Sequence, residues 1–134
     1  TFEMAAALVN QSNINCIAMT PNNLNELDAT VLDFLKKVPT AWDETRFLAG
    51  YPGKYVVLAR RHGDRWYIAG LNAEEKAISV NIDMKELAGQ RVALYSDTKA
   101  AAPIEAACKL KEVKVDKKGR LTVTMQPNGG VVIL

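Results

Sequence analysis

The sequence has 134 residues, which suffices for one domain with a single hydrophobic core, or for one domain with an additional fragment. Apolar residues make up 49% and charged residues 24%, a balance that excludes disordered, collagen-like and disulfide-dense classes. Seventeen Lys and Arg against fifteen Asp and Glu give a net charge of +2, which is too small to indicate a nucleic-acid partner. No apolar run approaches the roughly 20 residues needed to cross a bilayer, so no membrane-spanning segment is expected.

Residues 1–38 are predicted to form an α-helical segment, because apolar side chains recur there with the 3.6-residue period of a helix. One helix is expected at the start, around residues 2–9. A second is predicted from about Leu24 to Lys37, with Asn23 as its cap and Pro39 as its end. The first helix begins without a residue that could cap its free N–H groups, so we expect the chain to have been cut from a longer protein.

The short apolar run Ile14–Met19 lies between these two helices. Its length and composition are compatible with a buried strand and with another helical turn, and both interpretations stay open. Cys16 in this run and Cys108 are far apart in the sequence and lack metal-ligand spacing. Both are expected to be buried thiols rather than a disulfide or a metal site.

After Pro39 the hydrophobic period changes from 3.6 to 2, and the segments shorten to strand length. Strands are predicted over Lys54–Arg60 and Arg65–Leu71, joined as a hairpin and apolar on both faces, so they should lie centrally in a sheet. Further strands are predicted at Lys76–Ile82, Arg91–Ser96 and Val131–Leu134, and a second hairpin joins Lys109–Val115 to Arg120–Met125. The predicted fold class is mainly β: an antiparallel β-sandwich of about six to eight strands over residues 39–134, preceded by the helical segment.

No constellation in the sequence predicts a catalytic, cofactor-binding or metal site. The single histidine, His62, lies in a hairpin turn without a neighbouring nucleophile. Asp43 and Glu44 are adjacent carboxylates, but neighbours in an extended segment point to opposite faces and would not converge on one bond. They are expected to be structural or surface charges paired with Arg46 or Arg60.

Aromatic residues concentrate in the β-region, and exposed rings are what a sugar-binding surface needs for stacking on pyranose faces. Trp66 lies in a strand that is apolar on both faces, so we expect it mainly in the core. Tyr51, in a loop beside Pro52, is the better candidate for an exposed ring. Tyr51 and Trp66 are therefore the candidate glycan contacts.

Two consecutive stretches carry a family resemblance. Residues 38–46 read VPTAWDETR, and residues 53–72 read GKYVVLARRHGDRWYIAGLN. This long, ordered pattern resembles glycoside hydrolase family 97, whose members are α-glucosidases and α-galactosidases common in gut Bacteroidetes. The upstream stretch PNNLNELDATVLDFLKKV resembles the segment that leaves the catalytic barrel, and the end of the chain resembles the C-terminal β-domain of that family. Residues 47–52 are more apolar than the polar turn usual there.

The resemblance implies a parent enzyme with an N-terminal β-sandwich, a (β/α)8 barrel and a C-terminal β-sandwich. Residues 1–38 would then be the remnant of the barrel end, and residues 39–134 the C-terminal domain. The catalytic carboxylates of such enzymes, and the ligands of the calcium expected in the parent, precede the aligned stretch. No catalytic residue and no cofactor is therefore expected in this chain. The resemblance places one motif at the junction between barrel and C-terminal domain: Trp42, Asp43, Glu44, Thr45 and Arg46.

These implications predict a non-catalytic accessory domain of an enzyme that hydrolyses α-glycosidic bonds. Its expected partners are the catalytic barrel of the parent and a second copy in a homo-oligomer. Two alternatives are a carbohydrate-binding module that grips sugar with Tyr51, and a protein–protein interaction domain that uses the apolar helix face. A periplasmic or secreted location is typical of the family.

Overall fold

The structure is a computed structural model that describes residues 1–10, 12–100 and 107–134. Within these ranges the chain is mainly β, as predicted, with helices gathered before the first strand. The helices are α1 (Phe2–Val9), α2 (Asn23–Glu26) and α3 (Ala29–Lys37), with a 3-10 turn, η1 (Lys85–Leu87), further on. The strands are β1 (Glu44–Tyr51), β2 (Tyr55–His62), β3 (Arg65–Asn72), β4 (Ile78–Asp83), β5 (Arg91–Asp97), β6 (Cys108–Lys114), β7 (Arg120–Met125) and β8 (Gly130–Ile133).

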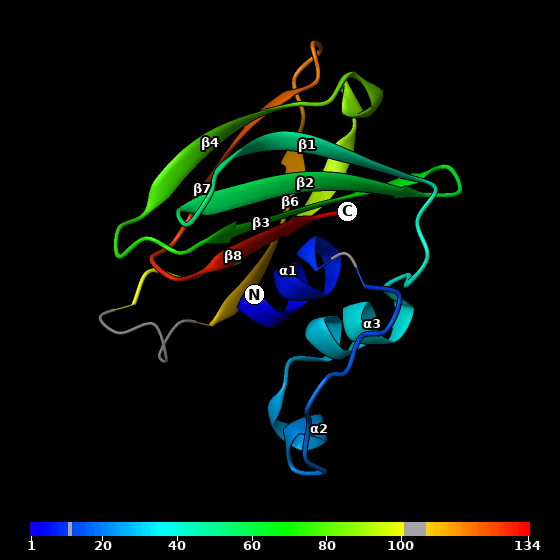
Figure 1. Cartoon of the computed structure of the whole chain (residues 1–134), viewed down its shortest axis with the longest axis vertical. Coiled ribbons are helices and arrows are strands. Elements are labelled where there is room, and N and C mark those ends of the chain that lie inside the picture. Colours follow the sequence, from blue (N-terminus) through cyan, green and yellow to red (C-terminus); the bar gives the residue numbers. More distant parts are fainter. Residues whose placement is uncertain (11, 101–106) are drawn as a thin grey trace.

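The strands form two antiparallel sheets that face each other (Figure 1). One sheet has the order β1-β2-β3-β8-β5-β6, and the other consists of β4 and β7. Apolar side chains from both sheets meet between them and make the first core, which includes Val57, Ile68, Val80, Val123 and Ile133. This arrangement confirms the predicted antiparallel sandwich.

The hairpin of β2 and β3 lies at the centre of the large sheet, as its sequence predicted. Its alternate side chains serve two different cores. Val57 and Ile68 point between the sheets, whereas Tyr67 and Ala69 point toward the helices. A strand buried on both faces needs apolar residues at every position, which explains the continuous apolar run.

The predicted hairpin of residues 109–115 with 120–125 is wrong. β6 pairs with β5 in the large sheet, and β7 pairs with β4 in the small one. The connection between β6 and β7 crosses from one sheet to the other at buried Val115, and Asp116 Oδ1 accepts hydrogen bonds from the backbone N–H groups of Lys118 and Arg120, each at 2.7 Å. The apolar faces of the two strands do meet, but across the core, because a period of 2 shows which face is buried and not which strand is the neighbour.

The predicted helix from Leu24 to Lys37 is two helices, α2 and α3, separated at Leu27 and Asp28. Asp28 caps α3, since its Oδ1 accepts hydrogen bonds from the N–H group (2.7 Å) and the hydroxyl (2.6 Å) of Thr30. The expected cap, Asn23, instead accepts from the backbone N–H group of Thr20 at 2.8 Å. Short polar side chains compete with the helix for backbone groups, so a capping residue inside a periodic segment starts a new helix.

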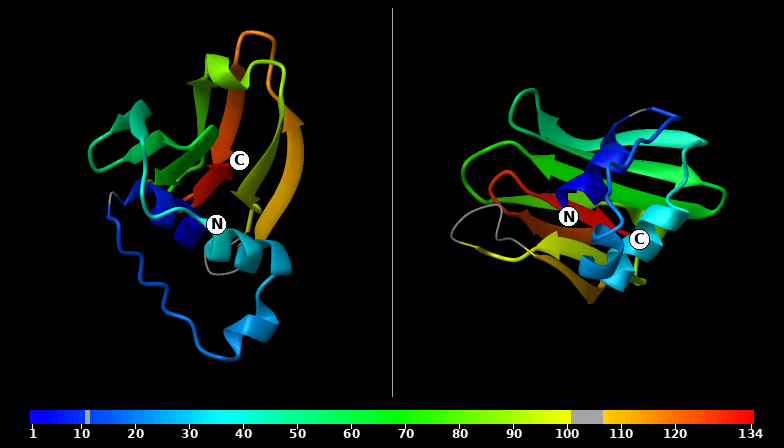
Figure 2. Two further views of the ribbon diagram at one scale, coloured as in Figure 1. Left: turned by 90° about the vertical axis from the view of Figure 1, so that its right-hand side faces the viewer. Right: turned by 90° about the horizontal axis from the view of Figure 1, so that it is seen from below.

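Helices α1 and α3 cover the other face of the large sheet and make the second core (Figures 1 and 2). Met4 and Leu8 of α1 are almost fully buried there, and Phe34 of α3 packs against Tyr95 with ring centroids 6.1 Å apart. Burial against this core raises the pKa of the Tyr95 hydroxyl above its ordinary value. The helical segment and the sheet are therefore packed as one unit.

Residues 14–19 form neither of the two structures left open by the sequence, because they lie outside every helix and strand. The segment loops away from both sheets (Figure 2, left). Cys16 is exposed, which corrects the expectation of a buried thiol, whereas Cys108 is half-buried with its Sγ 3.9 Å from Met4 Sδ. Over the described ranges, every helix is too short or too polar to cross a membrane.

Candidate functional site

The expected junction motif begins at the loop before β1 and continues into that strand, at one edge of the large sheet. Its side chains divide between the two faces of the sheet. Thr45 contacts Arg60 on the helix side, whereas Arg46 contacts Trp66, whose ring belongs to the core between the sheets. This alternation follows from the period of 2 in a strand.

Arg60 is the link between the motif and α1. Its side chain is only 6% exposed, Nη1 donates to the carbonyl oxygen of Leu8 at 3.1 Å, and Nε donates to Thr45 Oγ1 at 3.2 Å. The guanidinium also lies over the Trp42 ring, 4.6 Å from its centroid. Burial lowers the pKa of Arg60 from its ordinary value, but an arginine keeps its charge in proteins. A cation at the last turn of α1 is stabilised there by the negative end of the helix dipole.

Trp42 is packed edge-on between two other rings. Its ring centroid lies 5.2 Å from that of Tyr67 and 6.5 Å from that of His62. His62 is placed by its Nδ1, which lies 3.0 Å from the carbonyl oxygen of Ala41. Trp42 Nε1 is buried and has no hydrogen-bond partner within the part of the chain that the structure describes. The ring thus contributes packing between the β1 edge and the helix side.

A charged network occupies the opposite side of the same edge. Arg46 donates from Nε to Glu44 and from Nη1 to Glu86, which belongs to η1. These hydrogen bonds lower the pKa values of both carboxyl groups. Arg61 adds contacts of 3.4 Å to Glu44 and 3.7 Å to Asp43. The adjacent carboxylates are thus engaged with arginines, Glu44 with the expected Arg46 and Asp43 with Arg61.

The two candidate glycan contacts lie in very different surroundings. Trp66 is only 9% exposed and its ring is covered by Arg46, with Cζ 4.4 Å from the centroid, so no face is open to a sugar. Tyr51 is 64% exposed at the end of β1. Of the two rings, Tyr51 alone is placed to meet a partner.

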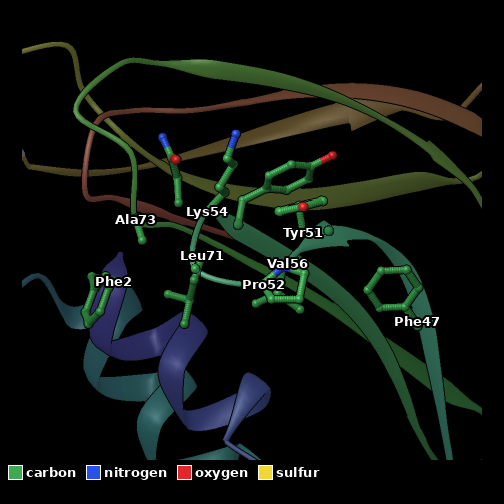
Figure 3. A pocket seen from close by; sticks show the side chains of 12 residues that line it. Phe2, Phe47, Tyr51, Pro52, Lys54, Val56, Leu71 and Ala73 are labelled. Atoms are coloured by element: carbon green, nitrogen blue, oxygen red, sulfur yellow. The ribbon is translucent and has the colours of Figure 1, made fainter.

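An apolar groove of about 550 Å³ lies on the helix side of the large sheet, and Tyr51 stands at its rim with its ring pointing away from α1 (Figure 3). Phe47 of β1 and Phe2 of α1 flank it and are 67% and 45% exposed, respectively. Half-buried Val56 and Leu71 form its floor. The groove is therefore a hydrophobic surface of this chain that α1 covers only at one end.

The path of β1 creates this groove. The register between β1 and β2 shifts between Phe47 and Ala49, a bulge that changes the direction of the strand. At Gly50 the two backbones approach so closely that a Cβ atom would lie 2.8 Å from the carbonyl oxygen of Tyr55. The exposure of Phe2 and Phe47 was not predicted from the sequence. The signal was present in the apolar character of residues 47–52.

The polar groups around the groove are largely engaged. Asn72 is fully buried, and its Nδ2 donates to the carbonyl oxygens of Lys76 and Gln126, both at 2.9 Å, while Oδ1 accepts from the N–H group of Glu74 at 3.0 Å. Lys54 Nζ lies 5.4 Å from the centroid of the Tyr51 ring and 3.9 Å from Glu74. The groove thus offers mainly apolar contact. Throughout the described residues, no three His, Cys, Asp or Glu side chains are grouped so that they could hold a metal ion.

Comparisons with curated proteins give relatives of much greater length. The chain is 31% identical over 134 residues to a retaining α-galactosidase from Bacteroides thetaiotaomicron. The aligned stretch covers 98% of this chain and 20% of the relative. A probable retaining α-galactosidase from Streptomyces bingchenggensis is 44% identical over 70 residues, or 51% of this chain and 11% of the relative. The chain spans about a fifth of the length of the first relative.

Two solved structures share the fold. A β-arabinopyranosidase superposes with a TM-score of 0.88 at 42% identity, over 97% of this chain and 20% of that enzyme. A Glycoside Hydrolase Family 97 enzyme from Pseudoalteromonas sp. strain K8, in complex with acarbose, gives a TM-score of 0.67 at 24% identity, over 84% of this chain and 18% of that enzyme. Residues 41–134 match the family described as "Glycosyl-hydrolase 97 C-terminal, oligomerisation". The chain belongs to this family of glycosyl-hydrolase C-terminal domains, as the sequence motif predicted.

Proposed function

We propose that this domain joins copies of its parent glycosidase, and that the apolar groove beside Phe47 and Tyr51 is the surface through which two copies meet. The single observation that carries the proposal is this exposed hydrophobic groove, on a domain whose family description includes the word oligomerisation. Phe2 and Phe47 together expose roughly 220 Å², if each has about 200 Å² in total. That area suits the apolar centre of a standard interface, which buries about 800 Å² per partner.

The two edges of the large sheet support the choice of this surface. The β6 edge carries lysines that keep other strands away, at Lys109, Lys111 and Lys114. The second half of β1, residues 47–51, carries no charge. An uncharged edge strand beside an apolar groove suits an identical partner, because two such edges meet antiparallel about a twofold axis and give a closed dimer.

A sugar is the second candidate occupant, and the exposed Tyr51 ring favours it. Sugar sites combine a stacking ring with free hydrogen-bonding groups, whereas the polar side chains at this groove are already engaged. Heat released on titration with galactosides or maltooligosaccharides at millimolar concentration would support the sugar over the second copy.

The test is the molar mass of the 134-residue chain in solution, measured by light scattering after gel filtration. Phe47→Glu places a charge at the centre of the apolar surface, so the wild-type chain should be a dimer and this variant a monomer. The matched control is Leu110→Glu, which changes an exposed apolar residue of β6 in the same way and should leave the dimer intact. A wild-type chain that stays monomeric at high micromolar concentration would exclude oligomerisation as its function.

We also infer that the parent enzyme acts on sugars of galactose-type configuration. The support is that one relative is named an α-galactosidase and another a β-arabinopyranosidase. An α-D-galactopyranoside and a β-L-arabinopyranoside share their ring stereochemistry and differ in the hydroxymethyl group. The parent enzyme should therefore hydrolyse aryl α-galactosides or aryl β-L-arabinopyranosides in preference to aryl α-glucosides, and the isolated chain should hydrolyse none of them. A preference for α-glucosides would contradict the inference.

A further inference from the structure

A second pocket, which we call the α3 pocket, lies at the other end of β3 from the apolar groove. It has a volume of about 280 Å³ and is lined by residues of α3, β3 and β5 and by Leu134 after β8. The groove lies at Leu71, near the end of β3, whereas the α3 pocket lies at Arg65 and Tyr67, near its start. Six residues of strand, roughly 20 Å, separate the two sites, so a small ligand in one does not contact the other.

Helix α3 presents a mixed polar and apolar stripe to the α3 pocket. Four of its residues line the pocket: Thr30, Asp33, Phe34 and Lys37. Residues three and four positions apart lie on one side of a helix, so these four form one continuous stripe. Phe34 is buried, whereas the other three residues are exposed. The stripe therefore supplies an apolar contact inside the pocket and polar groups at its rim.

Two tyrosine rings form the wall of the α3 pocket and are held in place by other rings. Tyr67 and Tyr95 are only 9% and 8% exposed. Tyr67 packs edge-on against Trp42 with ring centroids 5.2 Å apart, and Tyr95 packs against Phe34 at 6.1 Å. Side chains that are already fixed lose little conformational entropy when a ligand binds, which favours affinity.

The hydroxyl groups of these two tyrosines are available to a ligand. Among the residues that the structure describes, neither hydroxyl has a hydrogen-bond partner, and neither is closed off from solvent. A buried tyrosine hydroxyl usually has a partner. Burial raises the pKa of Tyr95, so its hydroxyl stays protonated at neutral pH and can donate a hydrogen bond. The charges of Asp33 and Arg65 also act on this hydroxyl, so both side chains lie within electrostatic reach of it.

The charges at the rim favour a neutral ligand. Asp33, Lys37 and Arg65 line the pocket, and none of the three forms an ion pair within the described ranges. Arg65 lies beside the wall, with Cζ 5.8 Å from the centroid of the Tyr67 ring. A ligand of either charge would be repelled by one of these groups. A ligand with several hydroxyl groups can donate to the carboxylate and accept from the two cations, and it brings no charge of its own to be desolvated.

We propose that the α3 pocket binds one neutral pyranose ring of a saccharide. Phe34 and Val38 offer apolar contact to the C–H groups of the sugar, and the hydroxyls of Tyr67 and Tyr95 offer hydrogen bonds. The volume of about 280 Å³ is just below the range of about 300–1,000 Å³ for pockets that hold drug-sized ligands, so it suits a single sugar ring. The inference goes beyond the proposed function, because this pocket is separate from the apolar groove.

A titration followed by nuclear magnetic resonance tests the proposal. The isotope-labelled 134-residue chain receives methyl α-D-galactopyranoside, methyl β-L-arabinopyranoside or methyl α-D-glucopyranoside at millimolar concentrations. At least one sugar should cause saturable shifts of backbone amide signals, clustered at Arg65, Tyr67, Tyr95 and α3. The absence of saturable shifts with all three sugars would overturn the proposal. Binding of acetate at these residues without binding of any neutral sugar would also overturn it, since the pocket would then be an anion site.

Two variants of the α3 pocket sharpen the result. Tyr95→Phe removes one hydroxyl and keeps the ring that packs on Phe34, so it should lower the affinity for the sugar about fivefold. Lys37→Ala changes an exposed side chain and should lower the affinity about twofold. Tyr51→Phe is the matched control, because it removes the same hydroxyl from an exposed ring at the groove and should leave the affinity unchanged. The melting temperature of each variant shows that the fold is intact.

Tyr51→Ala separates the two possible sugar sites, because it removes the exposed ring of the groove. Sugar binding that survives this change and weakens in Tyr95→Phe supports the α3 pocket. Binding that is lost in Tyr51→Ala and unchanged in Tyr95→Phe would place the sugar at the groove and overturn the proposal. The result is also distinct from that for the dimer, since the Phe47→Glu variant should bind the sugar as the wild-type chain does. A dimeric chain that binds no sugar would reject the α3 pocket and leave oligomerisation intact.

Discussion

The two faces of the large sheet differ in how completely this chain covers them. The face toward β4 and β7 is closed, with residues such as Ile68 and Ile133 almost fully buried between the sheets. The face toward the helices is covered by α1 and α3 at its middle, but open at the groove beside Phe47. Beyond the helices, the side chain of Ile14 is 83% exposed.

This difference separates the core that stabilises the fold from the apolar surface that stays exposed. A filled core between two sheets supplies the hydrophobic free energy that keeps a small domain folded. Surfaces that stay apolar and exposed reduce solubility unless something covers them, so they mark binding surfaces. The face toward β4 and β7 is thus the closed core, and the helix side carries the groove where we propose that two copies meet.

The largest expected effect compares one residue from each core. Ile68→Ala should lower the free energy of unfolding by about 4 kcal/mol, because the packed sheets around it cannot close the cavity. Leu8→Ala should lower it by only about 2 kcal/mol, because α1 can shift toward the sheet and fill part of the space. Urea unfolding followed by circular dichroism measures both values. Equal losses would mean that the helix side is packed as rigidly as the sandwich.

A smaller effect is expected at the contact between the helix side and the β1 edge. Arg60→Leu should lower the free energy of unfolding by about 1–3 kcal/mol, since the carbonyl oxygen of Leu8 and the hydroxyl of Thr45 lose a charged donor. Arg61→Leu is the matched control: its partners, Glu44 and Asp43, lie near the surface, so its loss should be smaller. A neutral Arg60→Leu would show that packing of α1 alone holds the helix in place.

The central hairpin was predictable from sequence and the partners of the outer strands were not. β2 and β3 follow each other around a turn with Gly63 at a φ of 58°, so local turn chemistry and apolar composition were sufficient. β6 and β7 are also joined by a short glycine-containing turn, but Val115 enters the core and sends the chain to the other sheet. The burial of Val115 at this turn directs β7 to the small sheet. The hydrophobic period of the sequence does not indicate this change of sheet.

In the helical segment, periodicity predicted the apolar face and missed the break. Phe34 is buried as the 3.6-residue pattern requires, yet Asp28 ends the periodic stretch by capping α3. Cys16 shows a different limit. Composition predicts burial wherever apolar residues cluster, yet Cys16 lies in such a cluster and is exposed.

The candidate site was predictable in part. The resemblance picked out Trp42 and its neighbours, and the structure shows how they connect the sheet edge with α1 through Arg60. The groove depends on a register shift between Phe47 and Ala49 and on the close approach at Gly50. Such features arise from strand pairing, so a single sequence does not reveal them before the pairing is known.

The second core fixes where this module can be cut for protein engineering. The match to the C-terminal family begins at residue 41, whereas the core under the helices is built from both sides of that point. A transplant that starts there would strip Met4, Leu8 and Phe34 from the sheet and leave Tyr95 and Val132 uncovered in the host. The smallest portable unit therefore includes the helices, and chimeras that exchange this region between enzymes should keep α1 and α3 together with the large sheet.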